Sequence, residues 1–170
     1  MKQLFNLLID FIYLLPRIIA YVIILLFFFI FISINFRYLE TYLFPLHLLK
    51  GKAKFISKNV IIGPYPEKRD LKKLKEKQGV TVVISLLDPS IPFEKSLLEK
   101  EKEITEKLGL KLFNFPLGYF HLRSEKNQQV VEEIIQFIKS YPKEKFYIHC
   151  YLGKHRIELV RERLKNAETK

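Results

Sequence analysis

The segment FYIHCYLGKHR, residues 146–156, decides how the rest of this sequence is interpreted. Its first four residues, 146–149, form a short apolar run typical of a strand, and a helical pattern begins at about Arg156. Between them lies a loop with Cys150 at its start and Gly153 near its centre. Strand, loop and helix in this order are the arrangement in which parallel α/β sheets bind ligands beyond their strand ends.

A loop of this composition can enclose one phosphate group. Its backbone N–H groups would point inward as an anion nest, and the following helix would add its positive end. Gly153 permits close approach of the backbone, and Arg156 offers a bidentate fork to two phosphate oxygens. The same positive field would favour the thiolate of Cys150 and make it a nucleophile. His149 would orient the loop through a hydrogen bond. The structural alternative is a buried cysteine at a chance strand–loop–helix.

Alternating strand and helix patterns surround this segment from Phe55 onward. Strands are predicted within 55–62, 80–87, 110–115 and 146–149, and helices over 67–78, 94–108, 124–141 and from about 156. The run at 80–87 is rich in β-branched residues, which is typical of a strand buried on both faces. The pattern predicts an α/β domain with a mostly parallel central sheet flanked by helices.

The N-terminal part of the chain is of a different kind. Residues 18–34 contain no charge, and with Asn35 and Phe36 they approach the roughly 20 residues that cross a bilayer. We therefore predict a transmembrane helix over about 18–36, within a membrane anchor and interfacial linker over 1–50 and before a domain over 51–170. A cleaved signal peptide is the alternative. Residues 4–15 are read as an interfacial or half-inserted helix, with a second paired span as the alternative.

Charge gives the expected orientation and the class of partner. Residues 1–50 hold only four basic and two acidic residues, so about +9 of the net charge of +11 lies in 51–170. The positive-inside tendency, with Arg37 and Lys50 following the span, predicts a single-pass protein with its C-terminal domain in the cytoplasm. A basic domain favours anionic partners, although lysine-rich solvated helix faces explain the charge equally well.

The segment 149–156 resembles the signature His-Cys-x-x-Gly-x-x-Arg of the cysteine-dependent protein tyrosine and dual-specificity phosphatase superfamily. The likeness is greatest to the compact dual-specificity branch, which includes atypical plant and fungal members that act on inositol polyphosphates. It extends over roughly 55–165. It implies that Cys150 forms a phosphocysteine and that Arg156 binds the phosphoryl group. The residues that would complete the phosphate cradle are Tyr151, Leu152, Gly153, Lys154, His155 and Arg156.

Three features depart from the pattern of that superfamily. Ile157 stands where a Ser or Thr usually follows the Arg, and the superfamily's additional C-terminal helices do not follow. Residues 116–123 contain no carboxylate at the place of the usual Asp general acid. His121, 29 residues before Cys150, is therefore the candidate acid, and the pair Asp88 and Glu94 is a more remote source.

The sequence thus predicts a membrane-anchored phosphatase that hydrolyses a phosphate monoester. The substrate would be a lipid headgroup, an inositol or sugar phosphate, or a phosphoprotein. The alternative is a pseudophosphatase that binds a phosphorylated lipid or protein without efficient turnover. Sulfur transfer of the rhodanese type is disfavoured, because those loops are typically shorter. We expect no metal and no cofactor, since Cys150 is the one cysteine. Nucleic acid is not expected as a partner, because no aromatic–basic array or known motif accompanies the charge.

Overall fold

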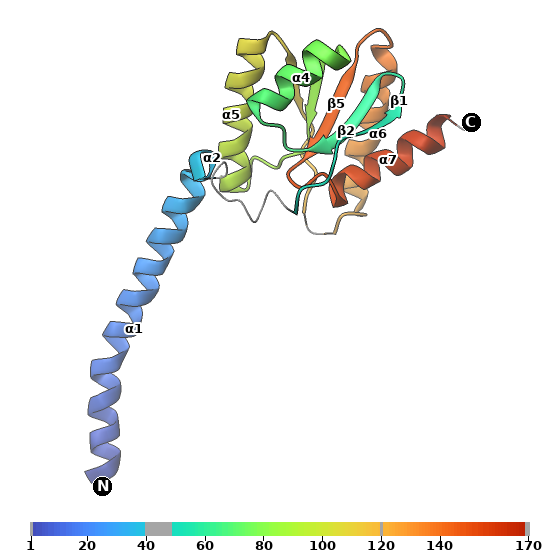
Figure 1. Cartoon of the computed structure of the whole chain (residues 1–170). Helices are drawn as coiled ribbons and strands as arrows, with labels where there is room; N and C mark the ends of the chain where they lie inside the picture. The colour runs from blue at the N-terminus through green and yellow to red at the C-terminus, as the bar shows by residue number, and fades with distance from the viewer. Residues whose placement is uncertain (1, 40–48, 120, 169–170) are drawn as a thin grey trace.

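Five strands form one mixed sheet in the computed structural model, which describes residues 2–39, 49–119 and 121–168 (Figure 1). The strand order is β1-β2-β5-β3-β4. Only β1 is antiparallel to its neighbour, so the expectation of a mostly parallel sheet is confirmed. The strands are β1 (Lys54–Ser57), β2 (Val60–Pro64), β3 (Val82–Ser85), β4 (Lys111–Asn114) and β5 (Phe146–Cys150).

Helices cover both faces of this sheet, as the sequence predicts. One face carries α4 (Lys68–Gln78) and α5 (Pro92–Leu108), and the other carries α6 (Glu125–Ser140) and α7 (His155–Glu168). Gly79 and Gly109 end α4 and α5 in the left-handed conformation that favours glycine. Ser124 caps α6 by accepting a hydrogen bond from the backbone N–H of Asn127.

The central strand β5 serves both layers because its side chains alternate. Phe146, Ile148 and Cys150 pack into the core beneath α6 and α7. Tyr147 belongs to the cluster beneath α4 and α5, and His149 stacks beside it. All five residues of β5 are buried. The strand therefore fixes which way each residue before the loop must point.

The predicted strand over 80–87 is shorter in the structure. β3 ends at Ser85, where its pairing with β4 ends, although Leu86 and Leu87 remain fully buried. The Leu86 N–H still donates to the His149 carbonyl over 2.9 Å. Beyond the strand, the Leu86 carbonyl accepts from Arg156 and from the Leu117 N–H, and the Leu87 carbonyl accepts from the Asn114 side chain.

The N-terminal helix α1 (Lys2–Ile34) is continuous through Pro16. Residues 4–15 therefore lie in line with the apolar segment, with no turn between them. Every side chain from Tyr13 to Phe31 is exposed, and the 22 residues Tyr13–Ile34 are long and apolar enough to cross a bilayer. The short helix α2 (Phe36–Leu39) follows. Much of the predicted interfacial linker, residues 40–48, lies outside the described residues.

Candidate phosphate-binding site

The loop after β5 lies at the carboxyl end of the parallel strands. β5 pairs with β2 up to Pro64 and Cys150 and with β3 up to Ser85 and His149, so the loop emerges between two neighbouring strand ends. α7 then begins at His155. This is the strand–loop–helix order that the sequence predicts, and Cys150 is 3% exposed at its start.

Gly153 permits the loop to turn back against β2. Its φ of 66° lies in the left-handed region that favours glycine. A Cβ atom at this position would lie 2.4 Å from the Pro64 backbone nitrogen, which no side chain can tolerate. The loop geometry therefore requires glycine for two independent reasons.

Hydrogen bonds fix the loop from its outer side. The Tyr151 carbonyl accepts from the Tyr65 N–H over 3.1 Å, and the Leu152 carbonyl accepts from the Gly51 N–H over 2.8 Å. In the described part of the chain, no protein group accepts from the backbone N–H groups of residues 152–156. With carbonyls held outward and amides unused, the loop is arranged to bind an anion.

Arg156 is buried at the start of α7 and held by an ion pair to Glu94 of α5. Its Nη1 donates to Glu94 Oε2 over 2.9 Å and to the Leu86 carbonyl over 3.0 Å, and its Nη2 donates to Glu94 Oε1. A longer contact joins Nη1 to the Leu117 carbonyl. Burial lowers the pKa of Arg156, but the hydrogen bond and charge of Glu94, together with Cys150 and Tyr119, outweigh it, so the pKa lies above its ordinary value. The guanidinium is therefore charged at every working pH.

The guanidinium still has donors to offer. Of its five N–H groups, Nε–H and one on Nη2 have no acceptor among the described protein groups. These two are the parallel pair that a bidentate phosphate contact uses. Glu94, weighed above as a remote acid source, is instead the partner that orients Arg156, because it is fully buried against the guanidinium.

A cavity of about 240 Å³ opens over the loop. Cys150, Leu152, His155 and Arg156 line it from the loop, and Tyr119 and Leu122 line it from the segment after β4. The Tyr119 ring lies over the guanidinium, with its centroid 5.1 Å from Arg156 Cζ. Thiol, unused donors and a space of suitable size thus meet at one place. Lys154 is exposed on the loop and does not line this cavity.

His149 makes a different hydrogen bond from the one expected. Its Nε2 lies 2.6 Å from Glu101 Oε1 of α5, and both side chains are fully buried. Alternation along β5 is the reason, because His149 points to the α5 face and Cys150 to the α7 face. Its ring stacks on Tyr147 and meets Tyr65 edge-on. His149 therefore ties the strand to α5 and does not bond the loop directly.

The segment after β4 is held by Asn127, a residue that the sequence analysis did not single out. Buried Asn127 accepts from the Gly118 N–H over 3.0 Å and donates to the carbonyls of Gly118 and Leu122 over 3.2 and 3.1 Å. His121 has a φ of 53°, and its side chain is exposed and does not line the cavity. Tyr119 and Leu122, missed from the sequence, line it instead.

Ile157 is 2% exposed and packs in the core, so no hydroxyl stands beside the thiol at that position. Among the described residues, no cluster of three or more His, Cys, Asp or Glu side chains suits a metal ion.

Comparison with solved structures places the fold. The core catalytic domain of the PP-IP phosphatase Siw14 from S. cerevisiae superposes with TM-scores of 0.58 and 0.59 in two structures, at 12% sequence identity. In both the match covers 71% of this chain and 68–69% of the Siw14 chain. This chain has the fold of the cysteine-based, dual-specificity-like phosphatases.

A protein of Shewanella putrefaciens CN-32 from the DUF442 group is similar as well. It has a TM-score of 0.54 and 18% identity, over 69% of this chain and 74% of that one. No protein-family model matches the chain, and no curated protein sequence matches it. The likeness is therefore one of fold.

Arg156→Lys should abolish most oxyanion binding while keeping a charge beside Glu94. The reason is that lysine lacks the planar fork, and each lost charge-assisted hydrogen bond costs roughly 1.5–3 kcal/mol. The measurement is thermal unfolding of the detergent-purified chain with and without vanadate. Arg163→Lys, on the exposed part of the same helix, is the control and should keep the full protection. Equal protection in both variants would show that the anion binds elsewhere.

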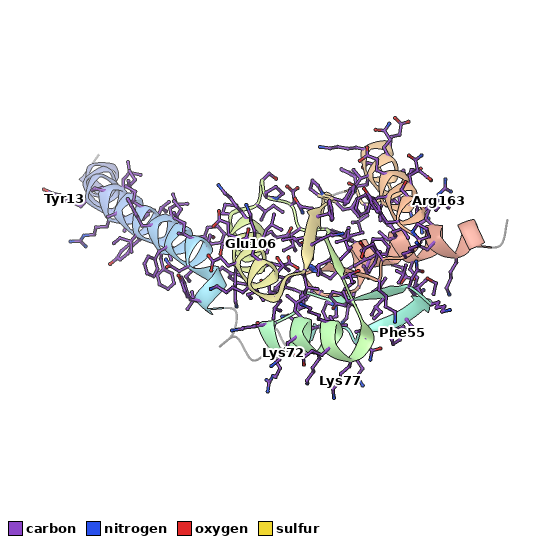
Figure 2. All side chains as sticks on the ribbon, turned by 90° about the horizontal axis from the view of Figure 1, so that it is seen from above. Tyr13, Phe55, Lys72, Lys77, Glu106 and Arg163 are labelled. Carbon is purple, nitrogen blue, oxygen red and sulfur yellow. The ribbon has the colours of Figure 1, made fainter. Side chains whose placement is uncertain are left out.

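Glu101→Ala should destabilise the protein by roughly 1–3 kcal/mol, because it leaves the buried His149 ring without its hydrogen-bond partner. Denaturant unfolding measures this change. Glu106→Ala is the matched control, since Glu106 is exposed on the same helix, and its effect should stay within about 0.5 kcal/mol (Figure 2). Similar small effects for both variants would refute a structural role for the buried pair.

Proposed function

We propose that this protein is a cysteine-dependent phosphatase that hydrolyses a phosphate monoester and is anchored in a membrane by α1. The observation that carries the proposal is the convergence of Cys150, the unused loop amides and two unused Arg156 donors on one cavity. Such an arrangement suits a phosphoryl group with three equatorial oxygens. Siw14, a PP-IP phosphatase with the same fold, supports a phosphorylated substrate for this chain.

The proposed reaction has two steps. The Cys150 thiolate attacks phosphorus, the bond from phosphorus to the ester oxygen breaks, and the leaving alkoxide takes a proton from a general acid. Water then attacks the phosphocysteine, which releases inorganic phosphate and returns the thiolate. The loop amides and Arg156 balance the charge of the transferring phosphoryl group throughout both steps.

The membrane anchor is proposed from the exposure of α1. Apolar side chains exposed on all sides of a helix are stable in lipid and costly in water. Basic residues after the span outnumber those before it, which favours a cytoplasmic domain: Arg37, Lys50, Lys52, Lys54 and Lys58 follow it, whereas Lys2 and Arg17 precede it with Asp10. A reducing cytoplasm also suits a free thiol.

A pseudophosphatase is the competing proposal, and one observation favours it. The buried apolar side chain of Ile157 stands where the superfamily signature has a hydroxyl, so nothing at that position assists the thiolate when the phosphocysteine breaks down. Binding would then be retained and turnover lost. The two proposals differ in whether phosphate is released, so one experiment separates them.

Turnover should depend entirely on Cys150. Release of p-nitrophenol from p-nitrophenyl phosphate by the full chain should be abolished in Cys150→Ser, whereas vanadate should still protect that variant from unfolding. The chain has a single cysteine, so iodoacetamide inactivation reports this site alone, and vanadate should slow it. A wild-type protein that binds vanadate but releases no product would establish the pseudophosphatase instead.

We propose His121 as the general acid for the leaving oxygen. It lies in the segment beside the cavity, and its left-handed backbone is of the strained kind that accumulates at functional sites. Its imidazole is exposed in this structure, and catalytic contacts often form only when substrate binds. The segment would have to bring the ring over the leaving group.

Substrates with different leaving groups test this acid. His121→Ala should slow hydrolysis of an alkyl phosphate by roughly 10²–10⁴-fold, because an alkoxide needs the proton, and slow p-nitrophenyl phosphate far less. Tyr119→Phe is the comparison variant, since the Tyr119 ring lines the cavity. It should hydrolyse the alkyl and the aryl phosphate in the same ratio as the wild-type protein. If Tyr119→Phe slowed alkyl phosphate hydrolysis selectively and His121→Ala did not, the proton would be assigned to Tyr119.

A further inference from the structure

Three aromatic rings join the N-terminal helices to the phosphate loop. Phe36 of α2 lies 5.4 Å from Phe93 and 6.0 Å from Tyr151, measured between ring centroids, and Phe93 lies 6.3 Å from Tyr151. We name Phe36, Phe93 and Tyr151 the aromatic junction. Tyr151 directly follows Cys150, and Phe93 directly precedes Glu94, which holds Arg156. The junction therefore contacts both elements that build the site.

The junction sets the depth of the site relative to a bilayer. The uncharged stretch 18–34, which begins just after Arg17, is about 26 Å long at about 1.5 Å per residue, close to a hydrocarbon core of about 30 Å. Phe36 follows Ile34 by two residues, at most about 7 Å of chain. With α1 across a bilayer whose headgroup layers are each about 5–8 Å thick, Phe36 and its neighbour Tyr151 would lie at headgroup level.

The site lies close to α2, which directly follows the apolar helix α1. In Figure 1, β5 runs toward the lower part of the domain, and α2 lies beside the lower part of α5. Exposed Lys52, Lys95 and Lys154 lie on segments beside the loop or the junction, and cations at this level attract anionic lipid. The lysine-rich helix α4 instead points Lys72 and Lys77 outward from the sheet (Figure 2).

The cavity itself is suited to one phosphate beside an apolar group. Among its described lining residues, Arg156 and His155 are the only basic side chains, and Tyr119, Leu122 and Leu152 are largely apolar. A soluble ester with many phosphates would need more cations than this cavity supplies. A lipid presents one terminal phosphate together with an apolar body.

From this geometry, and resting on the function proposed above, we infer that the substrate is a phosphate monoester at the end of a lipid headgroup in the same bilayer that holds α1. The junction holds the loop at the level where such a phosphate lies, so a lipid reaches Cys150 by lateral diffusion. The reaction is the one described above, with the lipid alcohol as the leaving group and inorganic phosphate as the second product.

The test compares a lipid phosphate monoester with two soluble phosphate monoesters. The full chain is reconstituted into phosphatidylcholine vesicles that contain phosphatidic acid, and phosphate release is measured. Glycerol 3-phosphate, the same ester without acyl chains, and a tyrosine-phosphorylated peptide are offered to protein in vesicles without phosphatidic acid. We expect release from the lipid to exceed release from either soluble ester by at least roughly tenfold, which corresponds to about 1.4 kcal/mol. Equal or faster hydrolysis of glycerol 3-phosphate or of the peptide would overturn the inference.

A second arm tests whether the lipid must share the bilayer. Phosphatidic acid placed in separate vesicles without protein should be hydrolysed far more slowly than phosphatidic acid in the protein's own vesicles. Phe36→Ala should reduce hydrolysis in the shared bilayer, whereas Tyr38→Ala, an exposed aromatic of the same helix, should not. Equal rates in shared and separate vesicles would refute the proposed placement.

Activity toward p-nitrophenyl phosphate in the same vesicles separates the two levels of proposal. If the wild-type chain did not hydrolyse p-nitrophenyl phosphate, the phosphatase function itself would be overturned. Activity toward it without preference for the lipid would overturn only the substrate inference. Protease added to intact cells tests the cytoplasmic orientation separately. We expect the domain to be protected from digestion.

Discussion

A buried ion pair between Arg156 and Glu94 is the constraint on which the site depends. The two residues come from α7 and α5, which cover opposite faces of the sheet, and they meet beyond the strand ends. Neither charge is stable alone at 2% and 0% exposure, so each requires the other. The pair holds the guanidinium in one orientation, with backbone carbonyls on one side and two donors left for a ligand. Buried pairs contribute little net stability, and here the pair supplies geometry instead.

The first turn of α5, which carries Glu94, also connects this pair to the N-terminal helices. Phe93, the neighbour of Glu94, contacts Phe36 of α2, and Tyr151, the neighbour of Cys150, contacts both rings. A displacement of α2 would therefore act on the loop through Tyr151 and on the guanidinium through α5. Helix α2 and the site therefore share a packing cluster, in contrast to an N-terminal helix joined to its domain by a linker alone. That coupling is a consequence of where the first turn of α5 lies.

The local parts of the site could be predicted from the sequence, and the partners could not. Cys150, Gly153 and Arg156 lie within one strand–loop–helix, so their spacing alone indicates a phosphate loop. Glu94 and Glu101 lie 62 and 48 residues from the groups they bind, and α5 carries several other acidic residues of the same appearance. Their seven-residue spacing places both on one helix face with Leu97, which is a weak signal. The side of β5 on which His149 falls follows from strand alternation, but its partner required the packed helix.

The distribution of charge argues against a simple reading of composition. The domain carries about +9, yet only Arg156 and His155 among the described cavity-lining residues are basic, and Arg156 is already balanced by Glu94. Most of the excess positive charge therefore lies outside the cavity, where it does not contact a phosphate bound there. Charge on the outer surface acts over about a Debye length, roughly 8 Å at physiological salt, and is felt by an extended anionic surface more than by one small ester. A basic exterior around a nearly neutral, partly apolar cavity fits the lipid substrate proposed above, because the outer charge would favour an anionic bilayer and the cavity would take a single phosphate.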